Sequence, residues 1–217
     1  MSKDKTIKNI FQYFGGFLIM TLGIALSVKS DLGVSPVSSI PYTITCVIGL
    51  EMGKATILFH VFLVLLQILI LRKQFKIKNL LQIPVGIVFG YFTTFCNFLM
   101  TFIASPDNMG IRVLMMIIST FLIAFGIHLY VPANLIPLAG EGAMLAISQK
   151  YGKKFSSVKL VFDISMVVIS LATCLITIHS IGTIIAAFCV GIELKWITKI
   201  SEISKRHKFL LNPAHHG

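Results

Sequence analysis

The sequence is poor in charged residues, above all in acidic ones. Only 12% of its 217 residues are charged, and 8 Asp and Glu stand against 19 Lys and Arg. Soluble domains carry roughly 25% charged residues. So few ionic groups do not cover a water-facing globule of this size, and 56% of the residues are hydrophobic. The composition excludes a disordered chain, a disulfide scaffold and a soluble nucleic-acid binder, and it predicts an integral membrane protein.

The motifs of catalysis and metal binding are also missing. The sequence contains no nucleotide-binding loop, GxSxG elbow, HExxH motif or paired carboxylates. Its four cysteines lie in apolar stretches without a CxxC pair, which is typical of small buried side chains; they are Cys46, Cys96, Cys174 and Cys189. We therefore expect no enzymatic activity, no metal site and no cofactor.

Long apolar runs dominate what is present. A bilayer core of about 30 Å needs roughly 20 apolar residues in a helix, and six stretches qualify: 10–29, 55–71, 80–104, 111–131, 158–178 and 181–198. Two shorter apolar pieces, 35–50 and 135–149, are interrupted by Pro, Gly or Glu. The first stretch is longer than a signal-peptide core and further spans follow it, so we expect it to be retained.

The positions of Lys and Arg predict the orientation, because cytoplasmic loops are enriched in both residues. If the six long stretches span and the N-terminus is inside, 16 of the 19 basic residues are cytoplasmic. The basic excess then sets orientation and contacts anionic lipid, and nucleic acid is not an expected partner. We expect a multi-pass plasma-membrane protein with both termini in the cytoplasm.

The two halves of the chain resemble each other. A shift of 103 positions places Gly23 on Gly126 and His60 on Asp163, whereas a smaller shift pairs Gly53 with Gly152. Each half contains one long helix, one short broken segment and two further long helices. Three crossings per half turn the second copy over, so the pattern predicts an inverted repeat of about 100 residues. The expected division is a cytoplasmic N-terminus (1–9), a first repeat (10–104), an extracytoplasmic loop (105–110), a second repeat (111–200) and a basic cytoplasmic tail (201–217).

The first broken segment enters from the outside and begins a short helix. Ser35 is placed as a serine N-cap and Pro36 as the first helical residue, where a missing N–H costs nothing. Pro41 is expected to limit the helix to about one turn. Backbone N–H groups at the helix start and the hydroxyls of Ser35, Ser38 and Ser39 suit a polar ligand. Alternatively, these serines bond their own backbone or pack between helices.

The second broken segment contains Asn134 and three residues that suit a ligand site: Gly140, Glu141 and Gly142. A helix is expected to begin near Glu141, where the helix dipole favours an acid. Glu141 is either an acid that lines the transport pathway or a solvated helix-start carboxylate. Together with Ser35, Pro36, Ser38 and Ser39, these residues form the predicted substrate site between the two broken segments.

Two further polar residues lie inside long spans, which makes each a functional candidate. Asp163 and His60 join Glu141 as candidates for charge or proton coupling. Asp163 is equally well placed to pair with Lys159 as an i,i+4 anchor, and His60 to serve as a histidine at a helix contact. Gly86 and Gly90 form a GxxxG pattern, which suits either internal packing or a homodimer seam.

The string Gly23–Pro36, with the segment Gly126–Gly142 and the Lys-rich loops, resembles the YczE/YyaS/YitT-like group of bacterial integral membrane proteins. The resemblance covers residues from about 11 to 200, and its most specific element runs from Asp31 to Pro36. It implies a polytopic plasma-membrane protein and supplies no substrate.

The leading hypothesis is a small transporter of a polar solute or ion, which binds near the midplane between the broken segments. One alternative is a substrate-binding membrane subunit of a multi-subunit importer, similar to energy-coupling-factor S components. Another is a non-transporting regulatory membrane protein. Expected partners are the lipid bilayer and a small-molecule or ion substrate.

Overall fold

The chain is a bundle of α-helices in the part that the computed structural model describes, residues 3–133 and 135–177. In chain order the α-helices are α1 (Lys3–Ser30), α2 (Pro36–Ile48), α3 (Met52–Leu71), α4 (Gln82–Thr101), α5 (Met109–Tyr130), α6 (Ala139–Tyr151) and α7 (Phe155–Thr177). Short 3₁₀ turns η1 (Arg72–Gln74), η2 (Ile77–Leu81) and η3 (Val131–Ala133) join some of them.

Five of these helices are long and apolar enough to cross a membrane: α1, α3, α4, α5 and α7, some extended by an adjoining 3₁₀ turn. They correspond to the first five predicted spans, and the two short helices α2 and α6 fall on the two interrupted segments. The polytopic all-α prediction is confirmed. The sixth predicted span, 181–198, lies outside the described residues.

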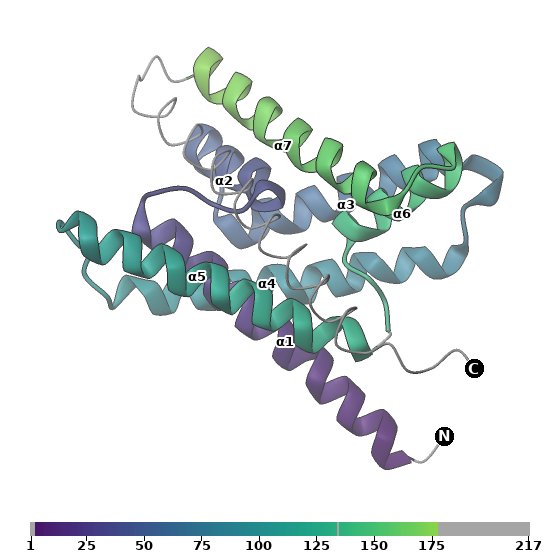
Figure 1. Ribbon diagram of the computed structural model, residues 1–217, viewed down its shortest axis with the longest axis horizontal. Helices are drawn as coiled ribbons and strands as arrows, with labels where there is room; N and C mark the ends of the chain where they lie inside the picture. The colour runs from purple at the N-terminus through teal and green to yellow at the C-terminus, as the bar shows by residue number, and fades with distance from the viewer. Residues whose placement is uncertain (1–2, 134, 178–217) are drawn as a thin grey trace, which may run out of the picture.

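The helices fall into two groups that α3 joins. Figure 1 shows α1, α4 and α5 together on one side of the molecule and α2, α6 and α7 on the other. Helix α3 packs on α4 in the first group and on α2 and α6 in the second. Helix α7 contacts both short helices. Each short helix therefore lies between two long ones.

The largest contact in the bundle joins α1 to α5, and glycine permits its close approach. A Cβ on Gly16 would lie 2.8 Å from the carbonyl oxygen of Gly126, and one on Gly23 would lie 2.9 Å from that of Ser119. The Ser119 hydroxyl donates a hydrogen bond to the Gly23 carbonyl at 2.8 Å. Residue numbers rise along α1 as they fall along α5, so the two helices are antiparallel.

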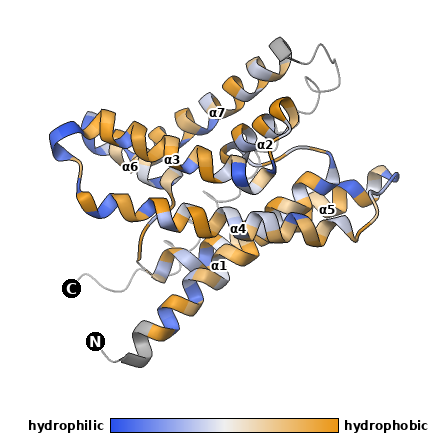
Figure 2. Ribbon diagram, turned by 180° about the vertical axis from the view of Figure 1, so that it is seen from behind, coloured by the Kyte–Doolittle hydropathy of each residue, from blue (hydrophilic) through white to orange (hydrophobic). Residues whose placement is uncertain are grey.

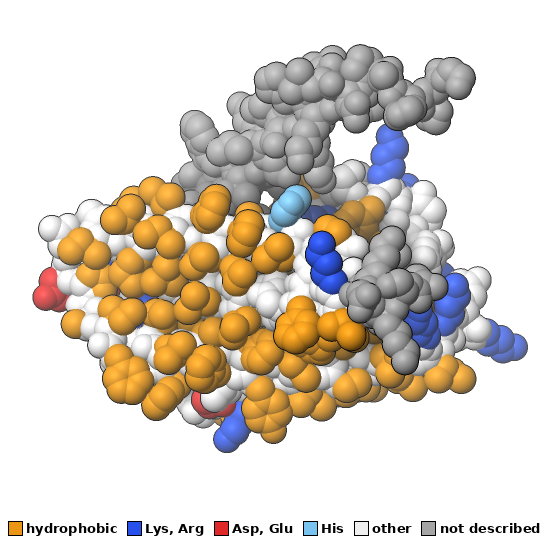
Figure 3. All heavy atoms as spheres, turned by 90° about the horizontal axis from the view of Figure 1, so that it is seen from below, with side chains coloured by type: hydrophobic (Ala, Val, Ile, Leu, Met, Phe, Trp, Pro, Cys, Tyr) orange, Lys and Arg blue, Asp and Glu red, His pale blue; other side chains and the backbone are white. Residues whose placement is uncertain are grey.

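The outer surface of the bundle is apolar. Leu69, Phe121 and Val161 are about 70% exposed (71%, 68% and 67%), and Figure 3 shows hydrophobic side chains across the face in view, with most Lys and Arg toward one end. Figure 2 places the hydrophilic residues mainly at the helix ends and turns, including the turn between α3 and α4. Such a surface suits contact with lipid and does not suit water.

Helix α2 begins as predicted but ends later. Pro36 occupies its first turn, and Ser35 takes the N-cap position, although the Ser35 side chain makes no capping hydrogen bond. The expectation that Pro41 stops the helix after about one turn is wrong, because α2 continues to Ile48. A proline this close to the start removes one backbone hydrogen bond, to the carbonyl four residues earlier, and Pro41 itself is buried.

The second short helix repeats the first at a distance of 103 residues. Helix α2 covers residues 36–48 and α6 covers residues 139–151. Each ends on a left-handed glycine, Gly49 with φ of 73° and Gly152 with φ of 61°, which is a common helix stop. Under the shift of 103 residues, the glycine that coincides with Gly152 is therefore Gly49, whereas the smaller shift of the sequence comparison pairs Gly152 with Gly53. Helix α6 also begins two residues before Glu141, at Ala139.

The GxxxG pattern of α4 is used for packing within the chain. A Cβ on Gly86 would lie 2.6 Å from Nδ1 of His60, and one on Gly90 would lie 2.8 Å from the carbonyl oxygen of Gly53. Helix α3 thus covers this face of α4. Of the two predictions for Gly86 and Gly90, internal packing is the one that these contacts support, and the homodimer stays a prediction.

Candidate functional site

The two short helices meet at their first turns inside the bundle. A Cβ on Gly140 of α6 would lie 3.4 Å from Cγ1 of Val37 of α2. Ala139 is fully buried, and Ser38 is 8% exposed. The helix starts that the sequence assigns to one site therefore approach each other at Val37 and Gly140.

The three serines of α2 bond to each other and to the backbone. The Ser35 hydroxyl donates to Oγ of Ser38 at 2.9 Å. The Ser39 hydroxyl donates to the Pro36 carbonyl at 2.6 Å and lies 3.4 Å from the Met166 carbonyl of α7. Ser39 thus follows the alternative interpretation, in which serines bond their own backbone and pack between helices. Ser35 and Ser38 share one hydrogen bond beside the contact with α6.

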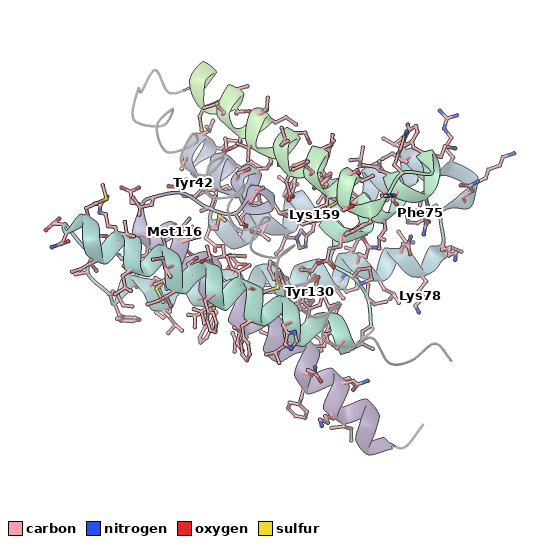
Figure 4. All side chains as sticks on the ribbon, viewed as in Figure 1. Tyr42, Phe75, Lys78, Met116, Tyr130 and Lys159 are labelled. Carbon is pink, nitrogen blue, oxygen red and sulfur yellow. The ribbon has the colours of Figure 1, made fainter. Side chains whose placement is uncertain are left out.

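Glu141 lies in the first turn of α6 and interacts with charged and hydroxyl groups from three other helices. It interacts electrostatically with Tyr130 of α5 and Lys159 of α7 and with Tyr13 of α1. The Tyr13 hydroxyl donates to the Ile136 carbonyl in the segment that leads into α6. Figure 4 shows Tyr130 and Lys159 near the middle of the molecule, with Phe75 and Lys78 at the end where α3 turns toward α4. The surroundings of Glu141 therefore include one ammonium and two phenol groups, and its side chain is partly buried.

Asp163 forms the predicted i,i+4 pair. The Lys159 ammonium donates to Oδ2 of Asp163 at 2.8 Å, and the Asp163 side chain is 5% exposed. Its Oδ1 has no hydrogen-bond partner within the described residues. Lys159 therefore interacts with two acids, Glu141 on α6 and Asp163 on its own helix.

His60 lies apart from these acids. Its ring stacks on Phe89 of α4 with centroids 5.5 Å apart and packs against Gly86. Its Nδ1 has no hydrogen-bond partner in the described part of the chain. The described contacts assign His60 to the α3–α4 interface, and no described hydrogen bond or ion pair joins it to Glu141 or Asp163. Asn134, the remaining predicted site residue, lies outside the described residues.

Sequence reasoning missed Gln82, the partner of Gln67 in a buried pair of carboxamides under α6. Nε2 of Gln67, which is fully buried, donates to Oε1 of Gln82 at 2.8 Å and lies 3.3 Å from the Ala139 carbonyl. Gly142 leaves the room for this pair, because a Cβ there would lie 2.5 Å from Nε2 of Gln82. Gln82 and Gly142 also line a cavity of about 150 Å³ that reaches the turn between α3 and α4. The only signal in the sequence was an amide within an apolar run.

No group of three or more His, Cys, Asp or Glu in the described ranges is arranged to hold a metal ion. The polar groups of the site are instead hydroxyls, carboxamides, two acids and one ammonium. They suit hydrogen bonding and charge pairing with a small ligand.

The apolar surface, the five membrane-length helices and the buried polar centre define a polytopic α-helical membrane protein. The chain belongs to the family of unknown function DUF6198, which matches residues 7–199.

Two curated proteins of Bacillus subtilis (strain 168) are similar to this chain. The uncharacterized membrane protein YczE is 27% identical over 141 residues, which cover 64% of this chain and 63% of YczE. The uncharacterized protein YyaS is 35% identical over 65 residues, which cover 30% of this chain and 32% of YyaS. The match thus spans less than two thirds of either relative. No solved structure matches the chain.

Proposed function

We propose that this protein is a plasma-membrane transporter of a small polar solute or ion, which binds between the first turns of α2 and α6. The observation that carries the proposal is the contact between Val37 and Gly140, where two short helices start against each other inside the bundle. Helices broken at membrane depth survive only when they are buried in protein or line a wet cavity. Paired broken helices of this kind are the best sequence pointer to a transporter's binding site.

An inverted repeat accounts for the arrangement. Under the shift of 103 residues, Gly23 corresponds to Gly126 and Met20 to Ile123. A Cβ on Gly23 would lie 2.8 Å from Cγ1 of Ile123, and one on Gly126 would lie 2.6 Å from Cγ of Met20. The contact therefore maps onto itself when the halves are exchanged, as a two-fold relation between antiparallel α1 and α5 requires. Val37 and Gly140 are also 103 positions apart, and their proximity is what such a two-fold relation predicts for residues near the axis.

The residues at this axis suit recognition of polar groups. The backbone N–H groups at two helix starts favour negatively charged or hydrogen-bond-accepting atoms. Ser35 and Ser38 add hydroxyls at the start of α2, and the absence of a side chain at Gly140 lets α6 start close to Val37. Glu141, whose charge interacts with that of Lys159, supplies a carboxylate that can bind a cationic group of the substrate or a proton. Lys159 is also ion-paired with Asp163.

The orientation follows the basic residues. Lys and Arg gather at one end of the described surface, and this end is cytoplasmic under the positive-inside rule. The predicted placement of both termini in the cytoplasm also requires the sixth span, which lies outside the described residues. The cavity beside Gln82 opens toward this end, which makes it a route to the site from the cytoplasm.

A solute screen by thermal shift on the detergent-solubilised full chain tests the proposal, followed by uptake into liposomes that contain only this chain. Binding to the native state raises stability by about 2.7 kcal/mol at a hundredfold excess over the dissociation constant. We expect the hit to lose its effect in Glu141→Gln and to keep it in Asp107→Asn. The control removes a carboxylate from an exposed loop in the same way.

The two assays separate the alternatives. Binding followed by uptake supports a transporter. Binding without uptake until an ATPase partner is added indicates a subunit of an importer. A screen in which no solute binds, with all fluxes unchanged by Glu141→Gln and Ser35→Ala, contradicts the proposal and indicates a regulatory protein.

A further inference from the structure

A second cavity lies at the opposite end of the bundle from the turn between α3 and α4. It measures about 300 Å³ and is lined by α1, α4, α5 and the loops that adjoin them. Pockets for small ligands start at about this size, and a cavity of about 150 Å³ already holds benzene. The lining residues are Ala25, Val28, Lys29, Asp31, Asn97, Met100, Thr101, Ser105 and Arg112. None of them belongs to the site between α2 and α6.

The charges in this cavity do not balance. Arg112 is paired, because its Nη1 lies 3.2 Å from Oδ2 of Asp31 and its Nε donates to the Pro106 carbonyl at 2.8 Å. The ammonium of Lys29 has no ion pair or hydrogen bond with any described residue. Two cations and one anion therefore line the same space, and one positive charge remains for a ligand.

The rest of the wall is divided between apolar and polar groups. Ala25, Val28 and Met100 supply an apolar side, whereas Asn97 presents an amide. Nδ2 of Asn97 donates to the Thr93 carbonyl at 2.9 Å, which leaves its second N–H and its oxygen for a ligand. A ligand that suits this wall has an anionic head near Lys29 and a short apolar body.

We propose that this cavity binds a small organic anion, a carboxylate with an apolar body, through Lys29 and Arg112. Asp31 acts as the competing internal anion, since its carboxylate occupies Arg112 when no ligand is bound. Asp31 has a left-handed backbone, with φ of 56°, and leads directly into the segment before Ser35. This cavity is separate from the site of the proposed function, so the two proposals are tested independently.

Benzoate and benzamide test this assignment because they have the same shape and differ in charge. Saturation-transfer NMR titration on the detergent-solubilised full chain measures both affinities. We expect benzoate to bind at least about tenfold more tightly than benzamide, as for a charge-assisted contact. The benzoate affinity falls as salt is raised, because the site is partly exposed. Equal binding of the two probes, or no benzoate binding, overturns the proposal.

Three variants locate the site. Lys29→Gln is expected to weaken benzoate binding about five- to tenfold. Lys54→Gln is the matched control: Lys54 is exposed, does not line the cavity, and its loss leaves the affinity unchanged. Asp31→Asn removes the internal competitor and is expected to tighten benzoate binding about threefold or more.

The gain in Asp31→Asn keeps the proposal testable if another variant folds poorly, since general damage to the fold does not tighten binding. The melting temperature of each variant without ligand reports its folding. If Lys54→Gln weakens binding as much as Lys29→Gln, benzoate binds to surface charge and the cavity assignment is wrong. If inorganic phosphate displaces benzoate at equal concentration, the apolar wall contributes nothing and the organic part of the assignment is wrong.

Discussion

Val37 and Gly140 occupy equivalent positions in the two halves of the chain and touch each other. A Cβ on Gly140 would lie 3.4 Å from Cγ1 of Val37, and the two residues are 103 positions apart. In a repeat related by a two-fold axis, only residues near the axis meet their own counterpart. The first turns of α2 and α6 therefore lie near the centre of the proposed symmetry, where one ligand is reached from both halves.

Cysteines at these two positions are expected to form a disulfide bond. The contact places the two Cβ atoms within about 5 Å, close to the range that a disulfide requires. The experiment replaces Cys46, Cys96, Cys174 and Cys189 by serine, introduces Val37→Cys with Gly140→Cys, and follows oxidation by a change in gel mobility.

A matched control combines Gly140→Cys with Gly15→Cys, because a Cβ at Gly15 meets nothing within 4 Å. Rapid oxidation of the first pair and none of the second supports the contact between the helix starts. Oxidation of both pairs at the same rate would contradict it. A solute that binds between α2 and α6 should slow the first reaction.

Alanine substitutions at the neighbouring glycines Gly15 and Gly16 of α1 are expected to change the free energy of unfolding in opposite directions. A Cβ on Gly16 would lie 2.8 Å from the Gly126 carbonyl oxygen and 2.8 Å from the Tyr130 nitrogen, both backbone atoms, whereas Gly15 faces open space. Gly16→Ala should lower the free energy of unfolding by about 1–3 kcal/mol through overpacking. Gly15→Ala should raise it by up to about 1 kcal/mol, since alanine favours helix.

Thermal melting of both variants in the same detergent measures this difference. Equal melting temperatures would mean that α1 and α5 are not in backbone contact. The comparison does not depend on any substrate, so it tests the antiparallel α1–α5 contact alone.

Gly142 is expected to be intolerant of a side chain because of the carboxamide pair beneath it. In Gly142→Ala, the new Cβ would lie 2.5 Å from Nε2 and 2.6 Å from Oε1 of Gln82, so Gln82 must move and its bond with Gln67 is lost. We expect a loss of about 1–3 kcal/mol, the cost of leaving a buried polar group unsatisfied.

Shortening the Gln82 side chain tests whether its clash with the new Cβ causes the instability of Gly142→Ala. The double variant Gly142→Ala with Gln82→Ala should lose less stability than the sum of the two single changes, because the added methyl group then has space. Gly140→Ala is the matched control, since its Cβ meets Val37 only at 3.4 Å. Additive losses would show that the clash with Gln82 is not the cause.

The sequence predicted the features that depend on neighbouring residues. Ser35 followed by Pro36 placed the start of α2, and the i,i+4 spacing of Lys159 and Asp163 predicted their ion pair. Hydropathy alone placed the five long helices, because the bilayer fixes their length and composition.

Features that depend on tertiary contacts were not predictable in this way. Gln82 stands at the first position of α4 and resembles an ordinary residue at the end of a span. Its burial follows from Gly142, 60 positions later in the chain. The interactions of Glu141 with Tyr13 and Tyr130 likewise join α6 to α1 and α5. Such contacts between distant helices cannot be predicted from a local sequence pattern. The prediction that Pro41 stops α2 was wrong for a similar reason. Proline generally breaks helices, but here it removes only one backbone hydrogen bond near the start of α2, and the helix continues.

The ion pair between Lys159 and Asp163 is expected to stabilise the fold asymmetrically. The Asp163 side chain is 5% exposed and that of Lys159 is 45% exposed. Lys159→Met leaves a buried carboxylate without its partner, whereas Asp163→Asn leaves a cation that reaches solvent. Removing one partner of a fully buried pair costs about 3–5 kcal/mol. Because Lys159 is half exposed, we expect a smaller loss of about 1–3 kcal/mol for Lys159→Met and less for Asp163→Asn.

The double variant Lys159→Met with Asp163→Asn should recover part of the loss, and chemical or thermal denaturation of the four proteins measures the cycle. If Asp163→Asn is the more damaging change, Asp163 is held by groups other than Lys159, and its Oδ1, which has no partner in residues 3–133 and 135–177, would be the atom to investigate.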